Sequence, residues 1–376
     1  MKNILITGGA GFIGSNLAFE LKKKGYNITI LDNLSAQIHG DLSNSPSYQK
    51  IKDLAHFIKG DVREKKDWLK AIDSQDAIIH LAAETGTAQS MYEIKKYSDV
   101  NIIGTSNLLD ILTNQEHNVS KIILASSRSI YGEGKYKCIS EGIVFPSLRS
   151  PDDIKEGKFN IFSKHTGEEL ELLPTDEESR IQPLSIYAIT KQQQEQMIML
   201  MGKALNIATI SLRYQNVYGP GQSLMNPYTG ILSIFSTQIF NNNDIEIYED
   251  GEQTRDFVYI EDVVDATILA LENEEANHQI FNVGSGIPTT VLTVAQKLKE
   301  LYNSSIKINI SGKSRTGDIR HNYADLSKIT NILGFQPRYS FDSGIYKFKN
   351  WVEKQKVYKD NYQETLRLLS KKGFIK

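Results

Sequence analysis

The sequence has very little cysteine and almost no net charge. Cys138 is the single cysteine among 376 residues, which excludes a disulfide within one chain and a cysteine-based metal cluster. The 43 basic and 45 acidic residues leave a formal net charge of -2, which excludes nucleic-acid binding through global positive charge. One free thiol is typical of a reducing compartment.

Long hydrophobic runs are absent as well. No uninterrupted apolar stretch approaches the ~20 residues that a membrane helix needs. Residues 1–7 form a short strand-like run that leads directly into a glycine turn, which is not the pattern of a signal peptide. We therefore expect a cytoplasmic protein that has neither a membrane nor a nucleic acid as its partner.

Short apolar runs alternate with helical stretches along the first half of the chain. Strands are expected at residues 3–6, 27–31, 55–59, 77–81 and 121–125, and helices at residues 12–24, 64–72 and 91–115. Continuous apolar strands joined by helices are typical of a parallel sheet that is covered on both faces. The pattern therefore predicts an α/β protein with a doubly wound sheet.

The length predicts about two domains, or one large domain with an appendage, because a domain has about 150 residues. We place the first domain at residues 1–212 and a smaller α/β domain at residues 213–376, with chain segments exchanging between the two. Residues 133–180 interrupt the first domain with a charged stretch that has no sustained periodicity. Loops of this length inside compact domains are commonly functional, so we expect a flap over a substrate cleft. A solvated excursion is the alternative.

A glycine series follows the first expected strand. Gly8, Gly11 and Gly14 belong to the run T-G-G-A-G-F-I-G, which also contains Phe12 and Ile13. Glycines at this spacing allow a tight turn, a close approach of a pyrophosphate and close packing of the helix on the strand. The helix N-terminus then offers N–H groups and the positive end of its dipole to the phosphates. This run predicts a dinucleotide site.

Asp32 ends the second expected strand and is followed by Asn33. A carboxylate about 20 residues beyond such a glycine series is placed to bond a ribose diol. Its negative charge would repel a 2′-phosphate, so the sequence favours NAD over NADP.

Three further residues form a candidate catalytic group. Ser127 lies at the end of the fifth expected strand, and Tyr187 and Lys191 lie four residues apart, on one face of a helix. A lysine ammonium beside a tyrosine stabilises the phenolate and lowers the tyrosine pKa from its usual value near 10. A tyrosine of this kind can take a proton from a sugar hydroxyl near neutral pH.

Together these motifs resemble the NAD-dependent epimerase/dehydratase family of extended short-chain dehydrogenase/reductases, and more narrowly its nucleotide-sugar 4-epimerases. The resemblance continues through H-L-A-A at residues 80–83, R-Y-Q-N-V-Y-G-P-G-Q at 213–222, R-D-F-V-Y at 255–259 and N-V-G at 282–284. It covers nearly the whole chain except residues 133–180 and the last residues. Residues 32–40 and the insertion are similar to a dTDP-L-rhamnose 4-epimerase-like subgroup.

The resemblance implies a Rossmann-type fold, NAD, a nucleoside-diphosphate sugar and a homodimer built on the helices at 91–112 and around Tyr187. It also implies roles for single residues, with Ser127, Tyr187 and Lys191 as the catalytic hydroxyl, base and partner of the base. Cofactor contacts are implied for Gly8, Gly11, Phe12, Ile13, Gly14, Asp32, Asn33, Asp61, Val62, Leu81, Ala82, Ala83, Tyr187, Lys191 and Tyr214. Substrate contacts are implied or expected for Glu84, Thr85, Ser127, Asn216, Arg255, Arg315 and Arg320. Surface solvation explains the last two arginines equally well, and helix capping does so for the 84–90 loop.

The residues after Ser127 select among the reactions of this family. Dehydratases carry Asp-Glu there and decarboxylases carry a Glu, whereas this chain has Arg128 and Ser129, neither of which is a carboxylate. Cys138 lies too far along the chain to match a thiol-dependent epimerase. We therefore expect C4 epimerisation through a 4-keto sugar, with Tyr187 as the base. The alternatives are an NAD(P)-dependent nucleotide-sugar reductase or dehydrogenase and a non-catalytic dinucleotide sensor.

Overall fold

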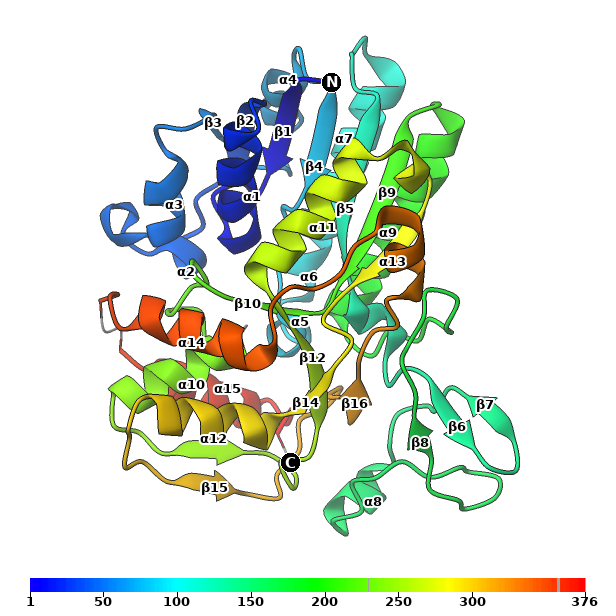
Figure 1. Cartoon of the computed structure of the whole chain (residues 1–376), viewed down its shortest axis with the longest axis vertical. Helices are drawn as coiled ribbons and strands as arrows, with labels where there is room; N and C mark the ends of the chain where they lie inside the picture. The colour runs from blue at the N-terminus through cyan, green and yellow to red at the C-terminus, as the bar shows by residue number, and fades with distance from the viewer. Residues whose placement is uncertain (229, 357–358, 376) are drawn as a thin grey trace.

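The structure is a computed structural model that describes residues 1–228, 230–356 and 359–375. A large sheet with helices on both faces fills one end of the molecule, and smaller sheets and helices fill the other end (Figure 1). No helix within the described residues combines the length and the apolar character needed to cross a bilayer.

The large sheet has seven parallel strands, in the order β3–β2–β1–β4–β5–β9–β13. The strands are β1 (Asn3–Thr7), β2 (Asn27–Asp32), β3 (His56–Lys59), β4 (Ala77–His80), β5 (Lys121–Ser127), β9 (Ala208–Tyr214) and β13 (Ile280–Val283). The order reverses between β1 and β4, and such a reversal opens a crevice at the carboxyl ends of the strands. The doubly wound α/β fold expected from the sequence is confirmed.

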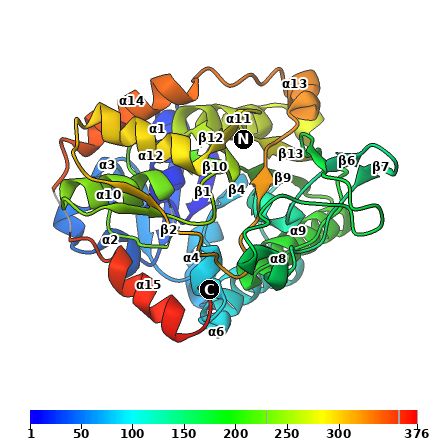
Figure 2. The same cartoon turned by 90° about the horizontal axis from the view of Figure 1, so that it is seen from below.

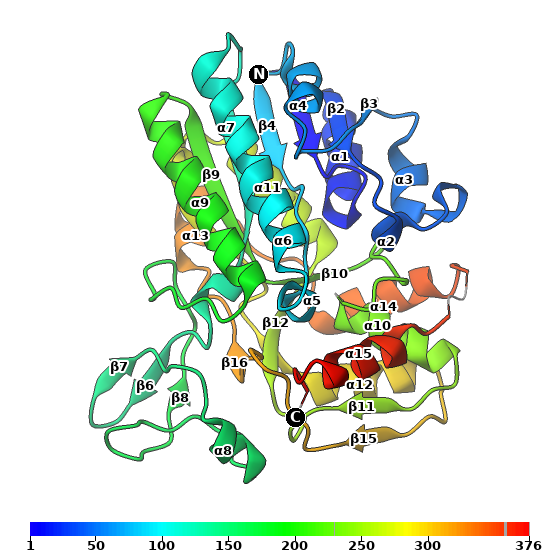
Figure 3. The ribbon, with the colours of Figure 1, turned by 180° about the vertical axis from the view of Figure 1, so that it is seen from behind.

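Helices cover both faces of this sheet. The first face carries α1 (Phe12–Lys23), α3 (Pro46–Ile51) and α11 (Ile260–Glu272), and the second carries α4 (Lys65–Ile72), α7 (Gly104–Asn114) and α9 (Ile186–Ala204) (Figures 1 and 3). Successive residues of β1 point to opposite faces, so Ile4 and Ile6 join one apolar core while Leu5 joins the other. This alternation is why the strand is apolar throughout.

The stretch at 91–115 is not one regular helix. It consists of α6 (Ile94–Tyr97), a π-helical segment η2 (Ser98–Ile103) and α7, and α5 (Thr87–Ser90) precedes it. The π-helical segment places Asn101 against Glu84, whose backbone N–H donates to Oδ1 at 2.8 Å and whose carbonyl accepts from Nδ2 at 3.1 Å. Single π-helical turns are frequent at functional sites, and this one fixes the loop that follows β4.

The second half of the chain builds the other end of the molecule. Its strands are β10 (Asn216–Tyr218), β11 (Ile245–Ile247), β12 (Thr254–Tyr259), β14 (Pro288–Thr290), β15 (Ile308–Ile310) and β16 (His321–Asn322). Its helices are α10 (Ile231–Phe240), α12 (Val291–Leu301), α13 (Ser327–Leu333), α14 (Phe341–Val352) and α15 (Tyr362–Lys371). The chain returns to the large sheet through α11 and β13, so residues beyond 212 contribute to both ends of the molecule.

Residues 133–180 fold into a small unit of their own. Strand β6 (Tyr136–Cys138) pairs with β7 (Gly142–Val144) and β8 (Glu171–Leu172) in an antiparallel sheet, and α8 (Pro151–Lys155) lies beside it. A separate apolar cluster of Tyr136, Cys138, Ile161 and Leu170 holds the unit together. Seen from below, this insertion lies at the edge of the molecule opposite α3 (Figure 2).

Candidate active site

A cavity of about 480 Å³ opens at the carboxyl ends of β1, β4 and β5 and reaches the smaller end of the molecule. Its size is ordinary for a small-molecule site, since such pockets measure roughly 300–1,000 Å³. It brings together most of the residues named from the sequence. These are Gly8, Gly11, Phe12, Ile13, Gly14, Asp32, Asn33, Val62, Leu81, Ala82, Ala83, Glu84, Thr85, Ser127, Tyr187, Lys191, Tyr214 and Asn216.

The glycine turn leaves no space for side chains. Gly8 has a φ of +67°, and a Cβ there would lie 2.8 Å from the backbone nitrogen of Ala82. A Cβ on Gly14 would lie 2.5 Å from the carbonyl oxygen of Gly8. Helix α1 begins after Gly11 without a side-chain cap, so N–H groups of its first turn are left for a ligand. This cradle fits the pyrophosphate of a dinucleotide.

Asp32 is buried at the end of β2 and held from two sides. Its Oδ2 accepts the N–H of Ala10 at 2.9 Å, and its Oδ1 accepts the N–H of Leu34 at 2.8 Å. Burial raises the pKa of Asp32, and these bonds together with nearby His39 oppose the rise. Nε2 of His39 lies 4.0 Å from Oδ1. The carboxylate is thus fixed where an adenosine ribose is expected.

Asp61, which was expected to contact the cofactor, does not line the cavity although its neighbour Val62 does. Its carboxylate accepts bonds from Nε and Nη2 of Arg63 at 2.9 and 2.8 Å and from Nδ2 of Asn33 at 3.0 Å. Burial alone would raise the pKa of Asp61, but these bonds lower it to about 2. The cofactor contact of Asp61 stays a prediction.

Tyr187 and Ser127 lie next to each other on the wall of the cavity. Ser185 caps α9 by accepting the N–H of Ala188 at 3.1 Å, which fixes the helical turn that carries Tyr187. Burial raises the pKa of Tyr187, and a hydrogen bond with Ser127 lowers it. Oγ of Ser127 accepts bonds from the backbone and side chain of Ser129 at 3.2 and 2.9 Å. The hydroxyl pair is therefore preorganised.

Lys191 belongs to a buried chain of polar side chains. Its Nζ donates to Oε1 of Gln194 at 2.9 Å, and Nε2 of Gln194 donates to Thr105 at 2.8 Å. His80 lies 3.1 Å from Thr105 through Nε2 and 2.7 Å from Thr7 through Nδ1. Burial lowers the pKa of Lys191 to about 7 and that of His80 to about 3. The sequence did not predict a role for Gln194 or Thr105. The one available indication was that Gln194 lies three residues after Lys191, on the same face of a helix.

Arg128 is the cation that acts on Tyr187 in this structure. Burial raises the pKa of Tyr187, and the charge of Arg128 opposes that rise. A lowering of the tyrosine pKa by Lys191 stays a prediction. Arg128 lines the cavity, and its Nε donates to Oδ1 of Asn216 at 3.0 Å. Burial lowers the pKa of Arg128 to about 9, so it remains charged at neutral pH. From the sequence it was noticed only as a residue that is not a carboxylate.

Arg255 and Arg315 do not line the cavity. Nη2 of Arg255 donates to Oδ1 of Asp318 at 2.8 Å. Nη2 of Arg315 donates to the hydroxyl of Tyr362 at 3.2 Å, and its guanidinium lies 5.3 Å from the ring centre of Tyr248. These contacts differ from the surface solvation that was the alternative for Arg315. Substrate contacts of both arginines stay predictions.

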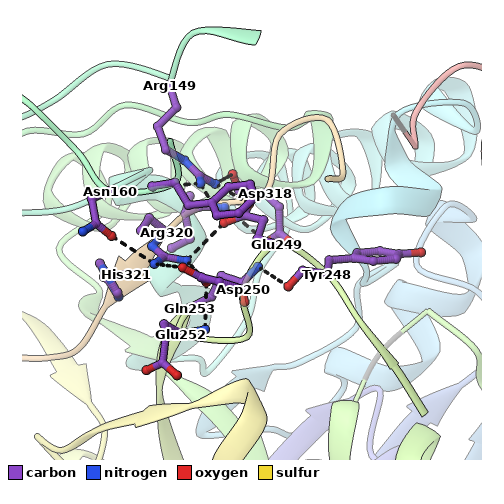
Figure 4. Close-up of polar contacts among 12 residues, drawn as sticks. Arg149, Asn160, Tyr248, Glu249, Asp250, Glu252, Gln253, Asp318, Arg320 and His321 are labelled. Atoms are coloured by element: carbon purple, nitrogen blue, oxygen red, sulfur yellow. Dashed lines mark hydrogen bonds and ion pairs between the residues drawn. The ribbon is translucent and has the colours of Figure 1, made fainter. Parts of the chain in front are cut away.

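Arg320 is 2% exposed, and other side chains of the protein accept its hydrogen bonds. Its Nη1 and Nη2 donate to the two carboxylate oxygens of Asp250 at 2.6 and 2.7 Å, as Figure 4 shows. Nη2 also donates to Asn160 at 3.0 Å. The structure thus places Arg320 in an ion pair outside the cavity, which differs from the surface solvation that was the alternative. A substrate contact of Arg320 stays a prediction.

The insertion at 133–180 contributes no described residue to the cavity wall. It contacts both ends of the molecule. Thr175 bridges to Ala324 and Arg149 reaches Glu249 at the smaller end, while Glu177 accepts the backbone N–H of Asn282 in β13 of the large sheet. The role of the insertion as a flap over the cavity stays a prediction.

Residues 4–150 and 161–284 match the NAD dependent epimerase/dehydratase family. The chain belongs to this family. The resemblance drawn from the motifs is confirmed, and with it the expectation of an enzyme. A dTDP-L-rhamnose 4-epimerase from Burkholderia thailandensis is 36% identical over 357 residues, which cover 94% of this chain and 96% of that protein.

Solved structures of two nucleotide-sugar 4-epimerases have the same fold. A UDP-glucose 4-epimerase from Thermotoga maritima, determined with UDP-glucose, has a TM-score of 0.76 at 28% identity, with 94% of this chain and 99% of that chain covered. A UDP-glucuronic acid 4-epimerase from Bacillus cereus, in complex with UDP-glucuronic acid and NAD, has a TM-score of 0.74 at 26% identity, with 93% and 99% covered.

Proposed function

We propose that this protein inverts C4 of a nucleoside-diphosphate sugar, with NAD as its cofactor. The observation that carries the proposal is that Tyr187 and Ser127 lie on the wall of the same cavity as the glycine turn and Asp32. Bound NAD would accept and return a hydride at its nicotinamide, so one site could oxidise and reduce C4. The family and its 4-epimerase members support this choice.

Tyr187 is the proposed acid and base. Its phenolic oxygen takes the proton of the C4 hydroxyl as a 4-keto sugar forms, and returns a proton when the opposite configuration is made. Oγ of Ser127 bonds the same substrate oxygen and holds it against Tyr187. Lys191 binds a ribose hydroxyl of the cofactor through Nζ. Arg128 and Ser129 provide no carboxylate for removing water, so elimination is disfavoured.

Substrate and cofactor preferences follow from the same wall. Glu84, Thr85 and Asn216 line the cavity and offer carboxylate, hydroxyl and amide groups to the sugar and its diphosphate. The buried carboxylate of Asp32 favours NAD over NADP. Contacts from Asp61, Arg255, Arg315 and Arg320 remain expectations, as does a cytoplasmic location.

A homodimer is proposed on the helices α6–η2 and α9, which lie side by side on the back of the large sheet (Figure 3). Large apolar side chains are exposed on them. They are Ile94 (50%), Ile103 (49%), Ile189 (41%) and Leu200 (69%). Sedimentation of wild type and of Leu200→Glu tests the pairing.

Proton NMR in heavy water tests the activity, with UDP-, dTDP- and GDP-sugars and no added cofactor. A new C4 epimer without deuterium on carbon, lost in Tyr187→Phe and kept in the exposed control Tyr346→Phe, is the expected result. Deuterium at C3 or C5 would indicate enolisation and contradict the proposal. Turnover that begins only when NADH or NADPH is supplied would identify a reductase. Unchanged biological function in Tyr187→Phe, with NAD still bound, would identify a sensor.

A further inference from the structure

Arg128 is half-buried in the cavity wall and differs from the arginines that are buried around the site. Four of them are neutralised by carboxylates at 2.6–2.8 Å. These pairs are Arg149–Glu249, Arg213–Glu195, Arg255–Asp318 and Arg320–Asp250. Among the described residues, no carboxylate oxygen lies within 4 Å of the guanidinium of Arg128. It is also the one arginine among the described residues that line the cavity.

In the described part of the chain, only the Nε of this guanidinium has a hydrogen-bond partner. Nε of Arg128 donates to Asn216, and no described residue accepts a hydrogen bond from its Nη atoms. The two carboxylates whose charges reach Arg128 are Asp318 and Glu133. Asp318 is bound by Arg255, and Glu133 accepts the N–H of Arg320 at 2.7 Å and pairs with Arg149 at 3.4 Å.

Because Arg128 is half-buried, its guanidinium has lost part of its water, and among the described residues it has gained no carboxylate at ion-pair distance. The Nη groups of an arginine form a planar fork that matches the two oxygens of a carboxylate or phosphate. A ligand that brings an oxyanion to this wall of the cavity would supply both the charge and the missing acceptors. Nothing in the neutral sugar ring itself would do so.

We propose that Arg128 binds an oxyanion of the nucleotide sugar through its Nη groups, and that this contact orients the sugar against Tyr187. The proposal rests on the proposed function, since it needs a nucleotide sugar in the cavity. Arg128 follows Ser127 in the chain and bonds Asn216, so it lies between the hydroxyl pair and the amide expected near the diphosphate. The oxyanion has two sources, the phosphate attached to the sugar and a carboxylate on a hexuronic acid.

Calorimetric titration of the NAD-loaded protein separates the two sources. The titrants are UDP, UDP-glucose and UDP-glucuronic acid. The same titrations are run with the corresponding dTDP and GDP compounds. The variants are Arg128→Gln, which removes the charge, and Arg128→Lys, which keeps it. Arg180→Gln removes an exposed arginine and is the matched control. Circular dichroism and retained NAD show whether each variant is folded.

A loss of about 10- to 100-fold in affinity for UDP and both sugars in Arg128→Gln would assign the phosphate. A loss of that size for UDP-glucuronic acid alone would assign the ring carboxylate. Arg128→Lys should keep more affinity than Arg128→Gln in both cases. Wild-type affinity of Arg128→Gln for every titrant would overturn the proposal, whether or not the enzyme epimerises. Weaker binding by Arg128→Gln without turnover in the wild type would overturn the proposed reaction and support this contact. A wild type that binds no titrant would overturn both.

Discussion

Arg149 of the insertion and Glu249 of the smaller domain form a buried, bidentate ion pair. Nη1 lies 2.8 Å from Oε2 and Nη2 lies 2.9 Å from Oε1, and the two side chains are 5% and 2% exposed (Figure 4). Arg149 also donates to the carbonyl oxygens of Phe159 and Asp318 at 3.2 and 3.3 Å. The insertion is therefore fastened to the smaller domain by charge, while its own apolar cluster stays separate.

Breaking this pair from one side should be strongly destabilising. Removing one partner of a buried ion pair typically costs ~3–5 kcal/mol, because the other charge stays buried without a partner. Arg149→Ala and Glu249→Ala should each lower the free energy of unfolding by an amount in this range, measured by urea denaturation. Arg149→Met with Glu249→Leu should lie closer to wild type. Lys155→Ala, in an exposed pair with Asp152, is the control and should change little. A one-sided variant as stable as this control would contradict the prediction.

Glu133 should make stability depend on pH. Burial raises the pKa of Glu133 from 4.5 to about 7, so the folded protein holds this proton more tightly than the unfolded chain. The stabilisation is complete below pH 4.5 and is lost as the pH rises through 7. The difference in unfolding free energy between wild type and Glu133→Gln should therefore fall across this window, as urea denaturation at several pH values will measure. A difference independent of pH would show that Glu133 titrates normally.

Gly14→Ala should abolish cofactor binding. The added methyl group would lie 2.5 Å from the carbonyl oxygen of Gly8 and 2.6 Å from Cα of Gly9, and backbone atoms cannot give way as a flexible side chain can. The turn would have to open, and the phosphate cradle would be lost. Gly25→Ala, just beyond the C-terminal end of α1, is the control, since its added methyl group meets no atom within 4 Å and lies outside the cavity. Titration with NAD should show binding in the control and none in Gly14→Ala. Tight binding by Gly14→Ala would contradict this account.

Asp32→Ala should weaken discrimination between the two dinucleotides. Loss of a charged acceptor costs roughly 1.5–3 kcal/mol per hydrogen bond, so NAD affinity should fall about 10-fold or more. NADP affinity should rise relative to NAD, because the charge that repels the 2′-phosphate is gone. Titration of both dinucleotides into the cofactor-free protein measures the ratio, and Asp41→Ala, an exposed carboxylate on the same loop, is the control. An unchanged ratio in Asp32→Ala would place the ribose elsewhere.

The sequence predicted the features that short stretches of chain encode. The glycine run at 8–14 and the apolar strands identified the sheet, the turn and the cofactor side of the cavity, because local sterics and burial dictate those residues. It did not reveal α10, α14 or the fold of the insertion, whose short strands lack a clear alternation. The sequence predicted regular helix at Ser98–Ile103, where the structure has a π-helical segment, because the residue composition of that segment is that of an ordinary helix.

By itself the sequence determined the doubly wound sheet, the phosphate turn and the candidate trio of Ser127, Tyr187 and Lys191. The tertiary structure alone decided which charges meet. Arg128 meets Asn216 across 88 positions of the chain, and Arg149 meets Glu249 across 100. Contacts over such separations depend on how the packed elements cross, and no local pattern of residues records that geometry. The sequence could therefore indicate candidate reacting groups, while folding decided which arginines are paired with carboxylates.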